Sequence, residues 1–166
     1  MILKGKAGLL FLALTALPFG CSFSRSLPVG SKAPDFNLPS LSSPSQQIRL
    51  SEINRENPVL LVFWASWCPN CVAEIPKLNE IFETKSAKGL KMIAVNVEET
   101  RDDILEFMKK TPVKYPVLLD EHGKTANLYG LAGIPVALYL EKGGEILYYG
   151  YELPGHLDQL LERRRS

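Results

Sequence analysis

The chain has 166 residues, of which 46% are hydrophobic and 22% charged, so it is long enough for one globular domain with a core. Its net charge is +1, which excludes a strongly basic surface of the kind that binds nucleic acid. The basic run ERRR at 162–165 is typical of a solvated helix end, where the helix dipole favours positive charge.

The first twenty residues have the pattern of a secretory signal peptide. Lys4 and Lys6 precede an uncharged apolar run at 7–17. A membrane span needs about twenty apolar residues, so a membrane anchor would have to continue through residues 18–23. A basic start before a short apolar run favours a cleaved signal instead. Removal of residues 1–20 would leave 17 basic and 18 acidic residues.

Cys21, the first of three cysteines, lies where a signal peptide would end. An exported chain meets an oxidising compartment, where an odd cysteine should be paired elsewhere, modified or removed. The segment LPFGC resembles the lipobox of bacterial lipoproteins, in which the cysteine becomes the lipidated first residue, although Pro18 departs from the usual pattern. The alternative is nearby cleavage that leaves a free thiol. We expect the polar segment 21–33 to be a tether.

Residues 34–166 are expected to form one α/β domain without an internal repeat. Apolar runs at 59–64 and 90–97 predict strands that are buried on both faces. Before the first of these runs, the sequence predicts a short strand that runs into a turn at 46–53. After it come a helix at 69–86, a helix at 101–110 capped by Thr100, an extended piece at 115–120, a short helix at 124–130, a hairpin of strands at 136–141 and 145–151, and a final helix at 153–165.

This order of elements determines the expected sheet. The two buried strands are joined through a helix, so they should be parallel with a right-handed crossover. The hairpin then adds antiparallel strands. The sequence therefore predicts a mixed central sheet with helices on both faces.

The segment FWASWCPNCVAEIP, residues 63–76, places Cys68 and Cys71 at the junction between the first buried strand and the first helix. Free N–H groups and the helix dipole stabilise negative charge there, so the pKa of a thiol should be lowered. Pro69 suits the first helical turn. Cys71 follows at i+3 on the same helix face. We therefore expect Cys68 to be exposed and nucleophilic, and Cys71 to be more buried and able to close a disulfide back to it.

The same segment resembles the active-site segment of thioredoxin-fold thiol-disulfide oxidoreductases. It is most similar to the exported branch that includes the TlpA-like and ResA-like proteins and the cytochrome c maturation thioredoxins. VGSKAPDFNL at 29–38 resembles the N-terminal extension of that branch, and the segment 115–146 resembles its distal half. The resemblance covers roughly residues 28–163. It implies a thioredoxin fold with an N-terminal extension.

The resemblance also implies roles for residues around the cysteines. Ile134 and Pro135 match the family's cis-proline loop, which faces the cysteines and offers backbone to an incoming peptide. An ordinary trans proline that opens a strand is the alternative. Trp67 is expected to flank the thiol at the surface and to contact substrate, whereas Trp64 belongs to the buried strand and is expected in the core.

Glu74 is the candidate for proton transfer. Thioredoxins themselves place a buried Asp on the first strand, where Val62 stands in this chain. Glu74 lies at i+3 from Cys71, and the ResA-like group carries a Glu at this spacing. Our hypothesis is that Glu74, with a raised pKa, handles the proton of Cys71 when that thiol attacks a mixed disulfide. The alternative is a solvated helix glutamate.

Taken as a whole, the resemblance implies a thiol-disulfide oxidoreductase that needs no cofactor and no metal. It would work at the periplasmic face of a bacterial membrane, anchored through a lipid on Cys21. Its expected substrates are disulfides of exported proteins, such as apocytochrome c, and its expected electron source is a thiol-disulfide donor in the membrane. Nucleic acid is not an expected partner.

Other classes of function are less well supported. A zinc site needs about four ligands, and beyond one C-x-x-C the chain offers only His122 and His156, which lack ligand spacing. APDF at 33–36 also occurs in peroxiredoxins, but their peroxidatic cysteine follows Pro and Thr where Leu61 and Ala65 stand here. A thiol peroxidase is therefore a weaker alternative. The alternative from a different class is a redox-inert or weakly active binding module, or chaperone, for an exported protein.

Overall fold

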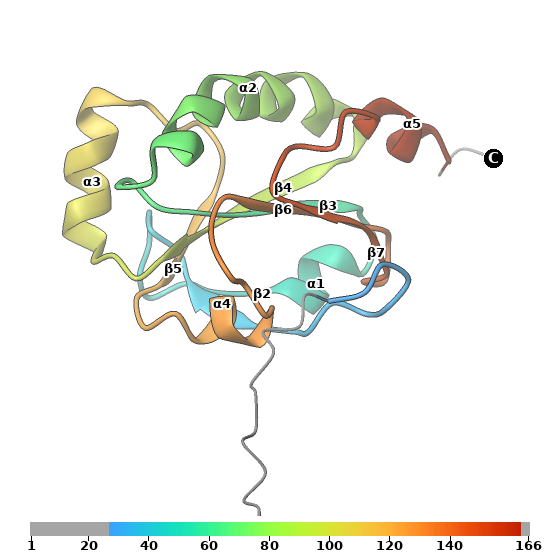
Figure 1. The fold of residues 1–166 in the computed structure, drawn as a ribbon, viewed down its shortest axis with the longest axis horizontal. Coiled ribbons are helices and arrows are strands. Elements are labelled where there is room, and N and C mark those ends of the chain that lie inside the picture. The colour runs from blue at the N-terminus through green and yellow to red at the C-terminus, as the bar shows by residue number, and fades with distance from the viewer. Residues whose placement is uncertain (1–26, 164–166) are drawn as a thin grey trace, which may run out of the picture.

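A five-stranded mixed sheet with the order β5-β4-β3-β6-β7 runs through the centre of the computed structural model, which describes residues 27–163 (Figure 1). β3 pairs in parallel with β4 and antiparallel with β6, β4 pairs in parallel with β5, and β6 pairs antiparallel with β7. This is the predicted mixed sheet. The strands are β3 Val59–Trp64, β4 Lys91–Val97, β5 Val117–Asp120, β6 Val136–Leu140 and β7 Ile146–Gly150.

Helices cover both faces of the sheet, as the sequence predicts. The helices α2, α3 and α5 lie over one face, and α1, α4 and a small N-terminal hairpin cover the other (Figure 1). The helices are α1 Leu50–Asn54, α2 Pro69–Lys85, the 3₁₀ helix η1 Ser86–Lys88, α3 Arg101–Lys110, α4 Lys124–Leu128 and α5 Leu157–Glu162; the hairpin strands are β1 Asn37–Pro39 and β2 Gln47–Arg49.

The central strand β3 is apolar throughout because both of its faces are covered. All six of its residues are buried. Successive side chains point to opposite faces of a sheet, so Leu60, Val62 and Trp64 join the core under α2, and the other three residues join the core on the α1 and α4 side. The expectation that Trp64 lies in the core is confirmed, since its exposed fraction is 2%.

The helices α2 and α3 begin and end within one residue of the predicted bounds. The final helix is shorter than predicted: α5 begins at Leu157 and not at residue 153, because residues 155–156 form a turn in which the N–H of Leu157 donates to the carbonyl of Pro154. Thr100 caps α3, and its hydroxyl accepts the N–H of Asp103 at 3.3 Å. α2 begins at Pro69, and Ile75, Leu78 and Ile81 form the buried face that packs on the sheet. The long helix therefore presents its N-terminal end at one edge of the sheet, directly after β3.

The N-terminal extension is more ordered than we expected. Where the sequence predicts a strand and a turn, β2 is followed by the short helix α1, whose Leu50 packs into the core on the α1 and α4 side. The expected tether ends at residue 33, but Gly30 N–H donates to the carbonyl of Ile146 and Ala33 N–H donates to the carbonyl of Gly144, each at 2.8 Å. The folded part of the chain therefore begins before residue 34.

The segments that carry the targeting signals fall outside this description. Residues 1–20, which we expect to be a signal peptide, and Cys21 lie outside the described residues. In the part of the chain between residues 27 and 163, no helix is long and apolar enough to cross a membrane.

Candidate active site

Strand direction brings three segments together at one end of the sheet. β3 and β4 are parallel, so the residues that follow their carboxyl ends meet at the same edge. β6 is antiparallel to β3, and its first residue, Val136, lies opposite Phe63 near the end of β3. The loop before β6, which contains Ile134 and Pro135, therefore lies beside the segment that follows β3.

Cys68 and Cys71 form a disulfide at the N-terminal end of α2. Cys68 is the N-cap residue, and its Sγ accepts the backbone N–H of Cys71 at 3.2 Å. Its carbonyl accepts the N–H of Val72 at 3.0 Å. Because the sulfur of Cys68 lies where a helix offers free N–H groups, a thiolate formed there after reduction would be stabilised.

Burial of the two cysteines differs from our expectation. The exposed fraction is 5% for Cys68 and 2% for Cys71, so the prediction that Cys68 is exposed is wrong for the oxidised protein. The reason is contact from across the fold, since the carbonyl oxygen of Ile134 lies 3.6 Å from Cys68 Sγ. Trp67, by contrast, is 62% exposed and lies at the surface beside the disulfide, as predicted.

The peptide bond between Ile134 and Pro135 is cis, in agreement with the resemblance to the cis-proline loop. Pro135 is buried and Ile134 is partly buried. A disulfide sulfur carries no hydrogen, so the approach of the Ile134 carbonyl to Cys68 is a packing contact in the oxidised protein. In the reduced protein, the thiol of Cys68 can donate a hydrogen bond to the same carbonyl.

An open pocket of about 700 Å³ lies next to the disulfide. It lies between α2, the cis-proline loop and the segment that follows β7. Its lining residues are Asn70, Ala73, Glu74, Ile134, Pro135, Tyr151, Glu152 and Leu153. The pocket gives a partner chain room to approach both the cis-proline loop and the first turns of α2.

Glu74 is a partly buried carboxyl group in this pocket. Burial raises its pKa above the ordinary value, and the negative charge of Glu152 raises it further. Glu74 also lies near the buried phenol of Tyr115, whose pKa is raised by burial and by the charge of Glu74. Glu74 is thus a half-buried carboxyl group with a raised pKa, one helical turn after Cys71 on α2.

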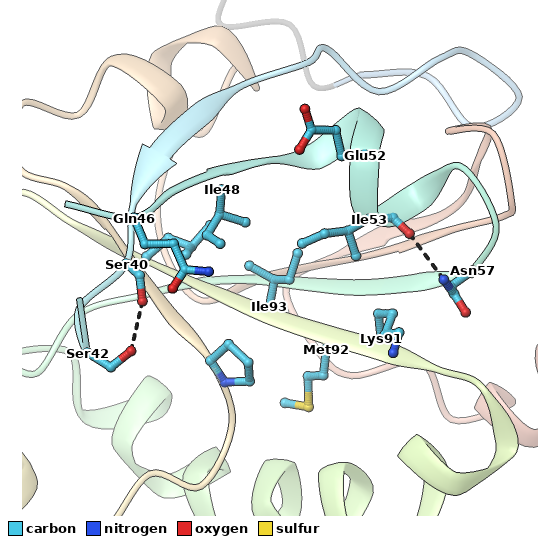
Figure 2. Close-up of a pocket in the computed structure, with 12 residues that line it drawn as sticks. Ser40, Ser42, Gln46, Ile48, Glu52, Ile53, Asn57, Lys91, Met92 and Ile93 are labelled. Carbon is cyan, nitrogen blue, oxygen red and sulfur yellow. Dashed lines mark hydrogen bonds between the residues drawn. The ribbon is translucent and has the colours of Figure 1, made fainter. Parts of the chain in front are cut away.

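A second pocket, of about 430 Å³, lies at the opposite end of β4, between that strand, α1 and the N-terminal hairpin (Figure 2). Ile48, Ile53 and Ile93 point toward one another inside it, and Lys91 lies at its edge (Figure 2). None of its lining residues belongs to the cysteine segment or to the cis-proline loop. Two pockets do include residues of those segments: the one beside Glu74, and another of about 380 Å³ on the side of Trp67 and Ile134.

Sequence reasoning did not identify a polar cluster behind the disulfide. Ser66, in the connection that leads to Cys68, is joined by hydrogen bonds to Glu99, which also accepts from Asn96. Asn96 is a polar residue in the otherwise apolar second half of β4, and Glu99 follows the end of that strand. The polar residues Asn96 and Glu99 at the carboxyl end of an apolar strand are a sequence signal, because the carboxyl ends of parallel strands lie at the same edge of the sheet. The signal could not be assigned to the cysteine segment without knowing that β4 lies beside β3.

A disulfide that caps a helix, a cis-proline loop in contact with it and a thioredoxin-like sheet define a thiol-disulfide oxidoreductase of the thioredoxin fold. Comparison with known proteins agrees. The chain belongs to the AhpC/TSA family, whose profile matches residues 29–149.

Individual relatives carry names of the same class. The thiol-disulfide oxidoreductase ResA of Geobacillus thermodenitrificans is 31% identical over 73% of this chain and 68% of its own length. A candidate thiol:disulfide interchange protein DsbE from Chlorobium tepidum superposes with a TM-score of 0.71 and 32% identity, over 84% of this chain and 96% of that one. The exposed lipoprotein thioredoxin of Streptococcus pneumoniae has a TM-score of 0.67 and 27% identity, over 78% of this chain and 99% of that one.

Proposed function

We propose that this protein reduces disulfides in exported proteins outside the cytoplasm, and that Cys68 and Cys71 carry the reaction. The observation that supports this most directly is the position of the disulfide, which caps α2 beside an open pocket that also contains Glu74. The names of the Geobacillus and Chlorobium relatives support the reaction class.

In the proposed cycle, the thiolate of Cys68 attacks one sulfur of a partner disulfide and releases the other partner sulfur as a thiolate. The product is a mixed disulfide. Cys71 then gives its proton to Glu74, and its thiolate attacks Cys68 Sγ, which breaks the mixed disulfide. The partner leaves with two thiols, having taken up two protons. The Cys68/Cys71 dithiol has supplied the two electrons and is left as the disulfide.

The partner chain is proposed to lie across the cis-proline loop. Ile134 and Pro135 would offer backbone to an extended segment, and the exposed indole of Trp67 would contact it from the other side of the cysteine. Such contacts hold the partner's sulfur in line with Cys68, and this positioning is what an exchange reaction needs from its binding site.

Location and electron supply complete the proposal. Residues 1–20 would be a cleaved signal peptide, and a lipid on Cys21 would hold the protein at the periplasmic face of a bacterial membrane through a short tether. The name of the Streptococcus pneumoniae neighbour, an exposed lipoprotein thioredoxin, supports this arrangement. A thiol-disulfide donor in the membrane would return two electrons to the oxidised pair, and apocytochrome c is the proposed substrate.

The equilibrium reduction potential of the Cys68–Cys71 pair tests the direction of the reaction. It would be titrated against dithiothreitol or glutathione in residues 22–166. We expect a value near or below that of thioredoxin, about −270 mV. A value near that of DsbA, about −120 mV, would make the protein an oxidant or isomerase. Failure to form any disulfide would favour the binding module, and faster reaction with hydrogen peroxide than with a disulfide peptide would favour the thiol peroxidase.

A further inference from the structure

The loop that delivers Cys68 is tied to the neighbouring strand through one carboxylate. Ser66 donates its backbone N–H to Glu99 Oε2 at 2.7 Å, and its hydroxyl donates to Glu99 Oε1. Asn96 donates from Nδ2 to Glu99 Oε2 at 2.7 Å. We call Ser66, Asn96 and Glu99 the serine anchor. Ser66 and Glu99 are 33 residues apart in the sequence, so this contact depends on the pairing of β3 with β4.

The backbone on both sides of Glu99 is held in place. Glu98 has a φ of +59°, a left-handed conformation that is uncommon outside glycine, and its N–H donates to the carbonyl of Asp120 at 3.1 Å. On the other side, Thr100 caps α3. Between these two neighbours, the partly buried side chain of Glu99 reaches Ser66 in the segment that follows β3.

The connection between β3 and α2 gives the anchor its importance. β3 ends at Trp64 and α2 begins at Pro69, so residues 65–68 must place Cys68 at the helix cap. Within this connection the N–H of Cys68 donates to the carbonyl of Ala65 at 3.3 Å, and Trp67 is largely exposed. The hydrogen bonds of Ser66 to Glu99 therefore restrain the connection near its middle.

We propose that Glu99 is a positioning residue, whose carboxylate holds Ser66 and thereby places Cys68 and Trp67 for attack on a partner disulfide. This inference rests on the proposed function and adds a residue to it. Glu99 acts through hydrogen-bond acceptance: its two oxygens accept from three donors, and one of those donors belongs to Asn96, which is 0% exposed. A buried amide that loses its acceptor has no water to replace it.

The acceptor role predicts different behaviour for two substitutions. In Glu99→Gln, the amide oxygen can take the place of Oε2 and accept from both Ser66 N–H and Asn96. The amide nitrogen then occupies the place of Oε1 and donates to the Ser66 hydroxyl, which can accept as well as donate. Glu99→Gln therefore keeps the anchor and removes only the charge. Glu99→Ala removes all three hydrogen bonds.

A carboxylate elsewhere in the fold provides a matched control. Asp35 accepts the N–H and the hydroxyl of Ser51, each at 2.9 Å, which repeats the chemistry of the anchor at the start of α1. Asp35→Ala removes the same kinds of hydrogen bond from the first turn of α1, together with the exposed ion pair to Arg49, in a part of the fold that does not carry a cysteine. It separates a loss of general stability from a loss of positioning.

The experiment combines two readouts on the wild type, the two Glu99 variants and Asp35→Ala. Hydrogen exchange followed by NMR measures protection of the Ser66 amide, and single-turnover kinetics measures the reaction of reduced protein with a disulfide-bridged peptide. We expect Glu99→Ala to lose protection at Ser66 and to react about tenfold more slowly, since small misplacements of reacting groups are costly. Glu99→Gln and Asp35→Ala should keep both properties within about twofold of the wild type, as expected for changes outside the reacting groups.

Each other outcome overturns the inference. Equal slowing in Glu99→Gln and Glu99→Ala would mean that charge and not hydrogen-bond geometry matters, and equal slowing in Asp35→Ala would mean a general loss of stability. If Glu99→Ala does not fold, Ser66→Ala, which deletes only the hydroxyl donor, must react more slowly than the wild type for the inference to stand. If the wild type reduces no disulfide, the proposed function is refuted. Hydrogen exchange at the Ser66 amide would still show whether Glu99 restrains the connection between β3 and α2.

Discussion

Replacing Glu74 by Gln should slow the attack of Cys71 on the mixed disulfide by about tenfold. General acid–base groups typically contribute about 10²–10⁴-fold. Glu74 lies in an open pocket and is only partly buried, so water can carry part of the proton transfer, and the expected loss lies below that range. Tenfold corresponds to about 1.4 kcal/mol in the barrier. The assay is single-turnover release of reduced peptide from the preformed mixed disulfide.

The pH dependence of the attack by Cys71 tests more specifically whether Glu74 is the group that accepts the proton. Burial and the charge of Glu152 raise the pKa of Glu74 above its ordinary value of 4.5, so the wild-type rate should rise as the pH passes through this raised pKa. In Glu152→Gln the neighbouring negative charge is removed. The pKa of Glu74 should then fall, and the same rise in rate should appear at lower pH. Glu74→Gln should lack this rise.

A glutamate on the same helix controls for the change in net charge. Glu80 is exposed and pairs with Lys77 at 2.9 Å, outside the pocket. Glu80→Gln should therefore keep the wild-type rate within about twofold. If Glu74→Gln matches the wild type at every pH, the proton-transfer role of Glu74 is refuted and the residue is a solvated helix glutamate.

The raised pKa of Glu74 also has a consequence for stability. A carboxyl group with a raised pKa in the folded state binds its proton more tightly there than in the unfolded chain. The free energy of unfolding should then decrease as the pH rises from 4.5 through the raised pKa. Glu74→Gln removes this loss, so the variant should gain stability relative to the wild type at pH 7 and show no such gain below pH 4.5. Urea unfolding at the two pH values measures the difference.

Two further predictions concern the cysteines and the N-terminal extension. Cys71→Ser should accumulate a mixed disulfide between Cys68 and a peptide substrate, visible by mass spectrometry; rapid turnover without such an adduct would exclude Cys71 as the resolving thiol. Tyr129 is 0% exposed and its hydroxyl donates to the carbonyl of Pro34 at 2.7 Å, so Tyr129→Phe should cost about 1 kcal/mol and lower the Tm by about 2–4 °C. The rate of disulfide reduction should not change, and a slower reaction would mean that the extension influences the active site.

The sequence alone predicted the features that depend on neighbouring residues. The C-x-x-C of Cys68 and Cys71 at a strand-to-helix junction, the cap at Thr100 and the buried strand at 59–64 follow from local spacing and short-range periodicity. Even the mixed sheet could be predicted, because a helical connection implies parallel strands and a short hairpin implies antiparallel ones.

The tertiary structure alone decided the contacts between segments that are distant in the sequence. The carbonyl of Ile134 covers Cys68 from 66 residues away, and Glu99 holds Ser66 from 33 residues away. Neither contact leaves a local pattern, since each depends on which strands are adjacent and in which register they pair. The prediction that Cys68 is exposed is wrong for this reason: a helix cap is exposed in isolation, whereas here Cys68 packs in the core on the α2 side and against the loop before β6.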